Sequence, residues 1–441
     1  MSKSDDERPA RFLWLPPGLR PPVPVPHVQE RILLLVGAAT VFSGYDFNIF
    51  GMALPQIQAE LHIPENQAAL TIAYFRLAAI PALFLALTAD LFGRRRLLLV
   101  TMIGAAIGTL LTAFAGTHTE FIWLQVFVRV FAYAEEMLAF VVIAEVMAPR
   151  IRGWSIGAMG ALGAFGAGLA SIVFGAVNLL PFGWRAIYVI GAGPLFLVAY
   201  FRRKLPETPR FEVREKEVEK LASRTRAGLQ AVRRLATEHP RRLMALLLTV
   251  ASFGFAVGPA TTLMSKYLQQ AHGYAPGEVT LLFLFGGAIS LAGNFLAGRI
   301  SDRVGRKATI IACALMAGAG YAMFYSGMGG WLLPLAWIVG LLGYLSGDAL
   351  VAGYPSEIFP TAYRATASGL RYLTSILFGA LGLTLEGPLY DWFVAQGFAA
   401  DMAHGPAILL PLLAIPVTVA AVLMLPEPAG RTLEEMTEAP A

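Results

Sequence analysis

Long apolar stretches alternate with short polar connections along most of the chain. Five of these stretches contain no Asp, Glu, Lys or Arg: 97–116, 155–184, 243–265, 279–298 and 405–426. Each can span about 30 Å of hydrocarbon as a helix of roughly 20 residues. The pattern therefore predicts an all-α membrane protein.

Applied to the whole chain, the same pattern predicts twelve transmembrane helices. We expect them at 31–57, 68–89, 97–116, 120–147, 154–179, 184–203, 243–267, 278–299, 308–328, 331–355, 367–388 and 405–425. The longest polar segment separates the sixth helix from the seventh and is the natural domain linker. The predicted organisation is an N-terminal tail at 1–30, a six-helix bundle at 31–203, a linker at 204–242, a second six-helix bundle at 243–425 and a C-terminal tail at 426–441.

Composition supports this interpretation and adds an orientation. The chain is 56% hydrophobic and 14% charged, whereas a soluble domain is about a quarter charged. In the predicted topology Arg185 and Lys266 lie outside, Arg76 and Arg129 lie within helices, and all other basic residues lie on one side. The positive-inside rule makes that side cytoplasmic, and an even number of helices places both termini there. The net charge of +5 then reflects loops facing anionic lipid, not a nucleic-acid partner.

An internal repeat relates the two halves of the chain. Three pairs of like residues share an offset of 212 positions: Asp90 and Asp302, Glu145 and Glu357, and Arg152 and Arg364. Chance basic loops at membrane borders do not explain one offset occurring three times with matched residue types. The repeat predicts a duplicated six-helix unit, and substrate sites in such proteins lie near the midplane between the halves.

The second loop, Gly298-Arg-Ile-Ser-Asp302-Arg-Val-Gly305-Arg-Lys307, resembles the signature of the major facilitator superfamily. The first copy departs from it at Ala86 and Leu91. The pieces that follow the fourth, sixth, tenth and twelfth helices resemble the sugar porter, organic ion transporter and aromatic acid–proton symporter branch. The resemblance covers about 28–435. It implies two pseudo-symmetric six-helix bundles and a secondary transporter that is not an enzyme.

The repeated loops predict a cytoplasmic gate. Charge-assisted bonds between their arginines and nearby carboxylates can form when this end is closed and break when it opens. The alternative is that the arginines only fix topology and reach the headgroups, but this leaves the acids unexplained. The candidate gate residues are Asp90, Arg94, Arg95, Glu145, Arg152, Asp302, Arg303, Arg306, Glu357 and Arg364.

Ionisable residues inside the predicted helices are functional candidates because burial in the bilayer is costly. At about 1.5 Å per residue, Asp46, Arg76 and Arg129 lie at similar depths, about 21–24 Å from the inner ends of their helices. An acid and two arginines at one level can neutralise each other. The resemblance implies that Asp46 and Arg129 act like the proton-coupling pair of proton-driven sugar porters. A static ion pair between helices is the alternative.

Two further acids extend the candidate coupling set. Glu136 and Asp348 are also separated by 212 positions, so they are expected to face one cavity from opposite halves. Glu135 is adjacent to Glu136, and the two side chains cannot point the same way; the sequence leaves open which one faces inward. The candidate proton-coupling residues are Asp46, Arg129, Glu135, Glu136 and Asp348.

The expected substrate is a small organic anion such as an aromatic carboxylate. The seventh helix lacks the Gln-rich signature of sugar porters, and the cavity helices offer arginines and aromatic rings, which suit a carboxylate. The candidate substrate-binding residues are Arg76, Arg129, Tyr45, Phe47, Tyr133, Phe253 and Tyr354. Uptake of a sugar or polyol with protons is one alternative, and efflux of a drug or organic cation is another.

The remaining expectations concern partners and location. We expect protons as the coupling ion, no metal and no other cofactor. The partners are a small-molecule substrate and the lipid bilayer, with no nucleic acid. We expect a monomer in a cell membrane, the inner membrane of a bacterium. A nutrient receptor on a transporter fold and a lipid scramblase remain open as other classes.

Overall fold

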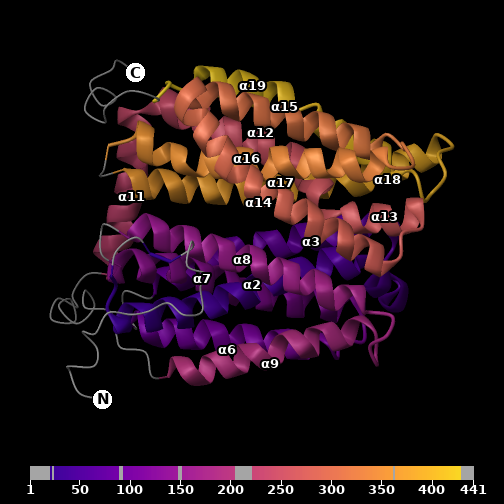
Figure 1. Ribbon diagram of the computed structural model, residues 1–441, viewed down its shortest axis with the longest axis horizontal. Coiled ribbons are helices and arrows are strands. Elements are labelled where there is room, and N and C mark those ends of the chain that lie inside the picture. The colour runs from indigo at the N-terminus through magenta and orange to yellow at the C-terminus, as the bar shows by residue number, and fades with distance from the viewer. Residues whose placement is uncertain are drawn as a thin grey trace. The chain divides into compact units, whose positions relative to one another are not determined.

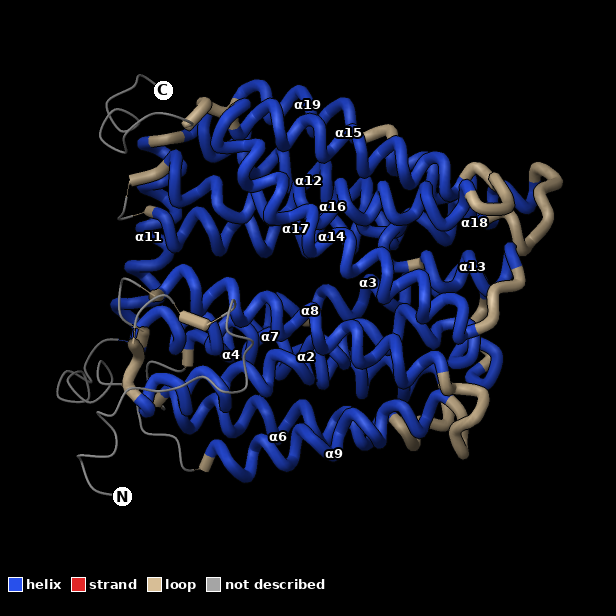
Figure 2. The backbone as a smooth tube through the Cα atoms, in the orientation of Figure 1, coloured by secondary structure: helices blue, strands red, loops and turns tan. Residues whose placement is uncertain are grey.

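The computed structural model describes residues 20–21, 24–88, 93–147, 151–203, 221–360 and 363–428, and the regular elements of this part of the chain are helices (Figures 1 and 2). Eleven helical spans among the described residues are long and apolar enough to cross a membrane. A further helix, α7 (His118–Val146), has the length of a span at 29 residues, but its five charged residues set it apart by composition. With α7 included, the predicted twelve-helix membrane fold is confirmed.

The first of two compact units comprises 1–50 and 78–219. Within it α6 packs against both α7 and α9, and α4 packs against α7 (Figure 1). Its described helices are the first part of α2 (His27–Leu61), α4 (Ala79–Leu87), α6 (Arg94–Thr112), α7, α8 (Arg152–Gly175) and α9 (Trp184–Arg202).

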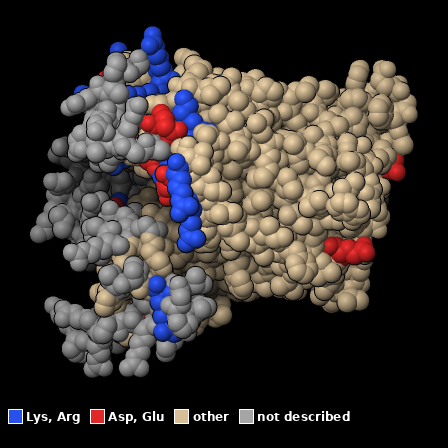
Figure 3. Space-filling model, turned by 45° about the horizontal axis from the view of Figure 1, so that its top comes forward, with Lys and Arg blue, Asp and Glu red and all other residues tan. Residues whose placement is uncertain are grey.

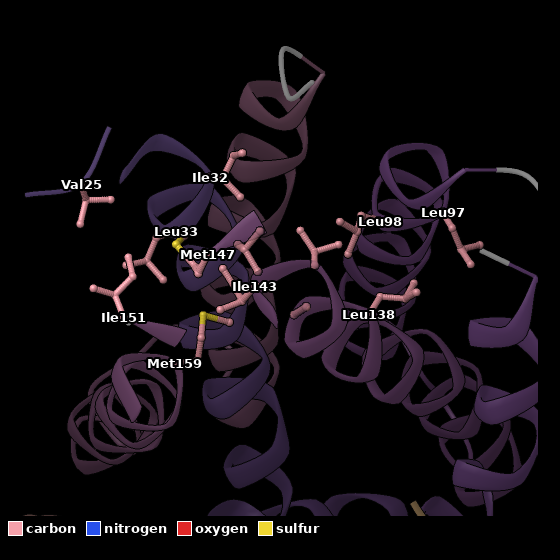
Figure 4. Close-up of a cluster of buried hydrophobic side chains, with 13 residues drawn as sticks. Val25, Ile32, Leu33, Leu97, Leu98, Leu138, Ile143, Met147, Ile151 and Met159 are labelled. Carbon is pink, nitrogen blue, oxygen red and sulfur yellow. The ribbon is translucent and has the colours of Figure 1, made fainter. Parts of the chain in front are cut away.

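A cluster of buried apolar side chains joins α2, α6, α7 and α8 at one end of this unit (Figure 4). Leu33 of α2, Leu98 of α6, Ile143 of α7 and Met159 of α8 all contribute to it. Close packing of this kind permits little relative movement of the helices that it joins. It therefore fixes the ends of α6 and α7, from which Arg94 and Glu145 extend.

The second unit comprises 51–77 and 220–441. In this unit α12 packs on α17 and α19, α16 packs on α14 and α15, and α3 packs on α17. The turn that follows α2 therefore belongs with the C-terminal helices. The described elements are the end of α2, the 3₁₀ turn η2 (Glu65–Gln67), α3 (Ala68–Leu77), α11 (Leu221–Glu238), α12 (Pro240–Thr262), α13 (Met264–His272), α14 (Pro276–Val304), α15 (Arg306–Tyr325), α16 (Leu332–Ile358), α17 (Arg364–Ala395), α18 (His404–Leu412) and α19 (Ile415–Met424).

The predicted domain boundaries lie partly outside the described residues. Of the predicted linker at 204–242, residues 204–220 lie outside the described residues, as do most of both predicted tails. The remainder of the linker forms α11 and the start of α12. The division into bundles at 31–203 and 243–425 stays a prediction based on the repeat, and grouping by contacts places 51–77 with the C-terminal helices instead.

Prolines explain why two predicted helices are each split in two. Pro81 cannot donate a hydrogen bond to the Leu77 carbonyl, and the predicted helix at 68–89 is divided there into α3 and α4. Pro416 has the same effect on the Leu412 carbonyl, and α18 is followed by the separate helix α19.

A third proline lies inside α2. Pro55 removes the hydrogen bond to the Gly51 carbonyl without ending the helix. The chain passes between the compact units at three places, and two of them are 50/51 in α2 and 77/78 between α3 and α4. Both coincide with a backbone carbonyl whose helical partner is a proline.

Charged side chains are unevenly distributed over the surface. On the face shown in Figure 3, Lys and Arg gather at one end of the helices, and the surface along the helices is free of both signs of charge. This is the asymmetry that the sequence predicts for a membrane protein with basic loops on one side.

Candidate functional site

Asp46 and Arg129 form a buried ion pair between α2 and α7 in the first unit. Arg129 Nη1 lies 3.4 Å from Asp46 Oδ2, and Arg129 Nη2 donates to the backbone oxygen of Asp46 at 3.0 Å. Thr109 of α6 donates to Asp46 Oδ1 at 3.3 Å. The two side chains lie at one depth and in contact, as the spacing along their helices suggests; their role in proton coupling stays a prediction.

This pair is incompletely hydrogen-bonded. Asp46 Oδ2 and Arg129 Nη1 are buried and face each other at 3.4 Å, outside hydrogen-bond geometry, and neither makes another hydrogen bond. Buried polar atoms in proteins are nearly always paired, and an ion pair out of water is stable only when its remaining lone pairs and protons are satisfied. The arrangement therefore has the capacity to accept a proton on Oδ2 or a ligand oxygen at Nη1.

Two of the predicted aromatic residues lie beside Arg129. Its guanidinium carbon is 4.6 Å from the centre of the Phe47 ring, and the Phe47 and Tyr133 ring centres are 5.1 Å apart. Both aromatic side chains are half-buried. Tyr45 lies differently, because it is buried and its hydroxyl donates to the Ile187 carbonyl of α9 at 2.9 Å. This position favours helix packing over substrate contact for Tyr45.

Glu135 and Glu136 differ in their surroundings, and which of them faces a cavity stays a prediction. Glu135 is buried and pairs with Arg202 of α9, and Thr101 of α6 donates to its second oxygen at 2.6 Å. Arg202 also donates to the Leu35 carbonyl at 3.1 Å. Glu135 therefore points into the interior of the unit with both oxygens bonded, which is the character of a static pair, whereas Glu136 is half-buried.

Asp348 has an arginine partner in the second unit that the sequence analysis did not identify. Arg371 Nη1 of α17 lies 3.4 Å from Asp348 Oδ1, and Arg371 Nε is a buried donor without a hydrogen-bond partner. Phe253 lies nearby on α12, with its ring centre 6.1 Å from that of Tyr344; Tyr344 itself is four residues before Asp348. An acid, an arginine and aromatic rings thus occur together in this unit as well.

The other two candidates in the second unit have different surroundings. Arg76 of α3 donates to Thr262 at the end of α12 at 2.9 Å, so its described contact is within the second unit, while the Asp46 pair belongs to the first. Tyr354 is fully buried, and its hydroxyl donates to the Pro426 carbonyl at 2.7 Å. That contact favours a packing role for Tyr354 at the end of the helices.

The two copies of the basic loop make the same ion pair, one in each unit. Arg94 contacts Glu145 through Nε at 2.7 Å and Nη2 at 2.8 Å, and Arg306 Nε lies 3.2 Å from both oxygens of Glu357. Each arginine follows a glycine with a positive φ, 89° at Gly93 and 111° at Gly305, a conformation that favours glycine. The pairs are repeat-related, which the offset of 212 residues predicts.

The second loop carries additional contacts. Arg306 also binds Asp302 and Ser301, and Glu427 accepts from the backbone N–H groups of Arg306 and Lys307 at 2.9 Å each. Glu427 thereby caps α15, because the first N–H groups of a helix have no partner within it. In the sequence this residue looks like part of the C-terminal tail.

The remaining gate candidates differ in what can be described. Arg364 donates to the Phe359 carbonyl at 3.1 Å and so closes its own loop, Arg95 donates to the Arg203 carbonyl, and Arg303 is exposed. Asp90 and the side chain of Arg152 lie outside the described residues. The gate function of the whole set stays a prediction.

A comparison within the second loop tests the gate. Asp302→Asn and Arg306→Gln remove contacts around Arg306 and are expected to raise the reactivity of a single cysteine placed near Glu357, because the closed state loses charge-assisted bonds. The measurement is the labelling rate with a membrane-impermeant thiol reagent after Cys313→Ser removes the one native cysteine. Arg303→Gln, in the same loop but exposed, is the control. Equal labelling rates in all three variants would rule out the gate.

Several important residues escaped the sequence analysis for one reason. Arg202, Arg371, Glu386 and His404 lie near the ends of the predicted helices, where charge is ordinarily explained by topology. Glu386 and Arg371 fall inside the predicted helix at 367–388 and Arg202 inside that at 184–203, and this was the available signal. The ion pairs that these residues make depend on neighbouring helices, which the local pattern does not contain.

Twelve membrane helices that enclose incompletely bonded ion pairs define a polytopic membrane transporter. The sequence profile of the Major Facilitator Superfamily matches residues 36–433, and the chain belongs to this superfamily. It is a secondary transporter, not an enzyme. The protein lies in the lipid bilayer and transports a small-molecule solute.

Relatives that are named as transporters match most of the chain. An ectoine/proline transporter of Corynebacterium glutamicum is 31% identical, over 81% of this chain and 77% of its own length. A putative niacin/nicotinamide transporter of Bacillus subtilis is 25% identical over 82% of this chain and 88% of its own. A probable 4-methylmuconolactone transporter of Cupriavidus pinatubonensis is 25% identical over 94% of both.

Solved structures show the same fold. A D-xylose–proton symporter matches with a TM-score of 0.73 at 19% identity, covering 91% of this chain and 99% of that protein. A bacterial homologue of the human lysosomal transporter Spinster, in an inward-facing and unoccupied conformation, matches with a TM-score of 0.70 at 17% identity, covering 90% and 95%. At these identities the likeness concerns the fold alone.

Proposed function

We propose that the protein is a proton-coupled symporter that takes up a small organic carboxylate, such as an aromatic acid. The observation that carries the proposal is the loosely bonded Asp46–Arg129 pair, in which one carboxylate oxygen and one guanidinium nitrogen are buried without a hydrogen-bond partner.

The pair links proton binding to anion binding by charge balance. A proton on Asp46 removes the negative charge that neutralises Arg129, and a substrate carboxylate can then replace it without leaving a net charge in the buried site. Arginine binds carboxylates strongly through paired N–H groups. Release of the substrate returns Arg129 to Asp46 and favours loss of the proton.

The surroundings of Arg129 favour an organic anion with an apolar or aromatic body. Phe47 and Tyr133 are half-buried beside the guanidinium and offer ring faces for stacking. These groups suit a carboxylate better than a sugar, which would require many neutral hydrogen-bonding groups.

The compounds named for the relatives support the same class. Niacin, proline, glycine betaine and ectoine each carry a carboxylate, and a shared carboxylate site with variable surroundings suits these compounds. Nicotinamide, which is named together with niacin for one relative, carries an amide in its place.

The proposal includes an orientation and a location. The basic ends of the helices face the cytoplasm, both termini lie there, and the solute moves inward. The bacterial relatives support a bacterial inner membrane, and we propose a monomer as the transporting unit.

Substrate class and coupling can be tested together on purified protein. We expect niacin, benzoate or proline, but not xylose or a quaternary amine lacking a carboxylate, to raise the thermal unfolding midpoint, because ligands stabilise the state that they bind. Uptake of the stabilising compound into proteoliposomes should increase when the external side is made acidic. Stabilisation by xylose alone would contradict the carboxylate assignment, and uptake indifferent to the gradient would contradict symport.

A further inference from the structure

Four ionisable side chains meet at the end of the second unit that is opposite to the Arg306 loop, where α13 and α18 lie (Figure 1). They come from four elements: Glu65 from η2, Lys266 from α13, Glu386 from α17 and His404 from α18. Lys266, Glu386 and His404 are buried, whereas the side chain of Glu65 is 39% exposed. None of the four belongs to the sites described above.

Both ring nitrogens of His404 face carboxylates. Nδ1 lies 2.6 Å from Glu386 Oε1, and Nε2 lies 3.2 Å from Glu65 Oε2. A neutral imidazole has one N–H donor and one nitrogen lone pair, and a lone pair facing a carboxylate oxygen is repulsive. The geometry is satisfied when the ring carries a proton on each nitrogen, so that both contacts are charge-assisted hydrogen bonds.

The charge balance of the cluster requires the same proton. Lys266 pairs with Glu65 and donates to Gln58 Oε1 at 2.8 Å. Burial lowers the pKa of Lys266 from its usual value, and the charge of Glu65 opposes that shift. Two carboxylates and one ammonium leave a net charge of −1, which a protonated His404 cancels. Glu386 Oε2 is buried without a partner, so no other group in its contacts supplies that compensation.

The neighbouring acids Asp391 and Asp401 are exposed, so water screens their charges and they contribute little to this balance. The Tyr390 ring stacks on His404 with centres 4.3 Å apart, and Asp391 accepts from Asn66 at 2.7 Å. Among the described residues, Tyr390 of α17 and Tyr325 of α15 are the further titratable groups that interact with Glu65 or Glu386; Asp391 and Asp401 interact with Tyr390, and Tyr267 of α13 interacts with Tyr325.

The cluster also holds the tip of the first helical hairpin. The turn η2 lies so close to α17 that a Cβ on Gly387 would be 2.0 Å from the Asn66 carbonyl oxygen. Glu65 is the residue of this turn that joins both His404 and Lys266. If His404 loses this proton, Glu65 faces a nitrogen lone pair and the charge of Glu386 is no longer compensated. Both effects oppose docking of the turn.

We propose that Glu386, His404 and Glu65 form a proton-binding site, separate from Asp46, whose occupation stabilises docking of the α2–α3 turn on the C-terminal helices. One proton from solution adds to the nitrogen lone pair of the His404 imidazole and forms a second N–H bond, and no bond between heavy atoms changes. The partly exposed Glu65 is the group through which this proton reaches the buried ring.

The protonation of His404 can be observed directly. The chain has six histidines, and ¹⁵N spectra of histidine-labelled protein in nanodiscs, compared with His404→Gln, identify the signals of His404. At pH 8 we expect protons on both of its nitrogens, whereas an ordinary histidine, with a pKa near 6.5, is neutral there. A neutral His404 at pH 7 would overturn the proposal.

Two variants define the partners. Glu386→Gln and Glu65→Gln should each lower the pH at which His404 loses its proton by at least about one unit, a tenfold loss of proton affinity. Glu65 is half-exposed in a turn, so its variant keeps the test available if the buried Glu386→Gln does not fold. Asp401→Asn, an exposed acid at the same end, is the control and should leave the titration unchanged. A shift as large in the control would reduce the effect to general electrostatics and refute the site.

Docking of the turn is tested by a cross-link. Gln56 Nε2 donates to Gln269 Oε1 of α13 at 2.6 Å, so Gln56→Cys with Gln269→Cys, in a Cys313→Ser background, reports on the docked turn. Relative to the same pair carrying His404→Gln, cross-linking should fall as the pH passes through the titration of His404. If the ratio of cross-linking in the two proteins does not change with pH, docking of the turn does not depend on the His404 proton, and the docking part of the proposal is refuted. Neither the ¹⁵N titration nor the cross-link requires transport. Failure of this proposal can therefore be distinguished from failure of the proposed symport.

Discussion

Asp46→Asn is expected to reduce uptake driven by a proton gradient by at least about tenfold, equivalent to about 1.4 kcal/mol. Asparagine cannot carry the proton, and it leaves Arg129 buried without its counter-charge. The measurement is uptake of the stabilising carboxylate into proteoliposomes with and without an imposed pH gradient. Exchange of substrate at equal pH should persist better than gradient-driven uptake, since exchange requires no net proton transfer.

Thr109→Val provides the matched control for this variant. It removes the hydrogen bond at 3.3 Å to Asp46 Oδ1 and leaves both the carboxylate and its arginine in place. We expect a smaller loss of uptake and a retained response to the gradient. If Asp46→Asn accumulates substrate under a gradient as well as the unmodified protein does, the proton is carried elsewhere.

Arg202→Met should be among the most destabilising single substitutions in the first unit. It leaves Glu135 charged, buried and bonded only to Thr101, and breaking a buried pair from one side typically costs about 3–5 kcal/mol. The double variant Arg202→Met with Glu135→Met should recover much of the loss, because no charge then remains uncompensated. Thermal unfolding of the purified variants in one detergent gives the ranking.

The double variant is also what separates a static pair from a functional one. Recovery of both stability and uptake would identify Glu135 and Arg202 as structural. Recovery of stability with continued loss of gradient-driven uptake would return Glu135 to the candidate proton carriers. If Arg202→Met alone is as stable as the unmodified protein, that result would contradict the burial of the Glu135–Arg202 pair.

The repeated loops were predictable because their requirements are local. A positive φ at Gly93 and Gly305 and an arginine beside a carboxylate are properties of a short stretch and one neighbouring helix. The offset of 212 residues then places Arg94 with Glu145 and Arg306 with Glu357. The same local character explains why the apolar stretches predicted the membrane helices well.

The interruptions and the buried polar clusters were not predictable in the same way. An apolar stretch continues through Pro81 or Pro416 without any change of pattern, although the backbone loses a hydrogen bond at each. Arg202 pairs with Glu135, 67 residues away in the chain, and His404 pairs with Glu65, 339 residues away. A charge near a predicted helix end has an ordinary explanation until its neighbours are known, and burial is the property that distinguishes these residues.

The prolines at 55 and 81 bear on how such a transporter can move. The hairpin formed by α2, α3 and α4 has its tip, 51–77, with one compact unit and its base with the other. Any motion between the units must therefore bend or shear this hairpin, and the backbone lacks a hydrogen bond at the Gly51 and Leu77 carbonyls where it crosses. The hairpin is therefore expected to bend at these two positions. Under the proposal above, protonation of His404 stabilises the docking of its tip on the C-terminal helices.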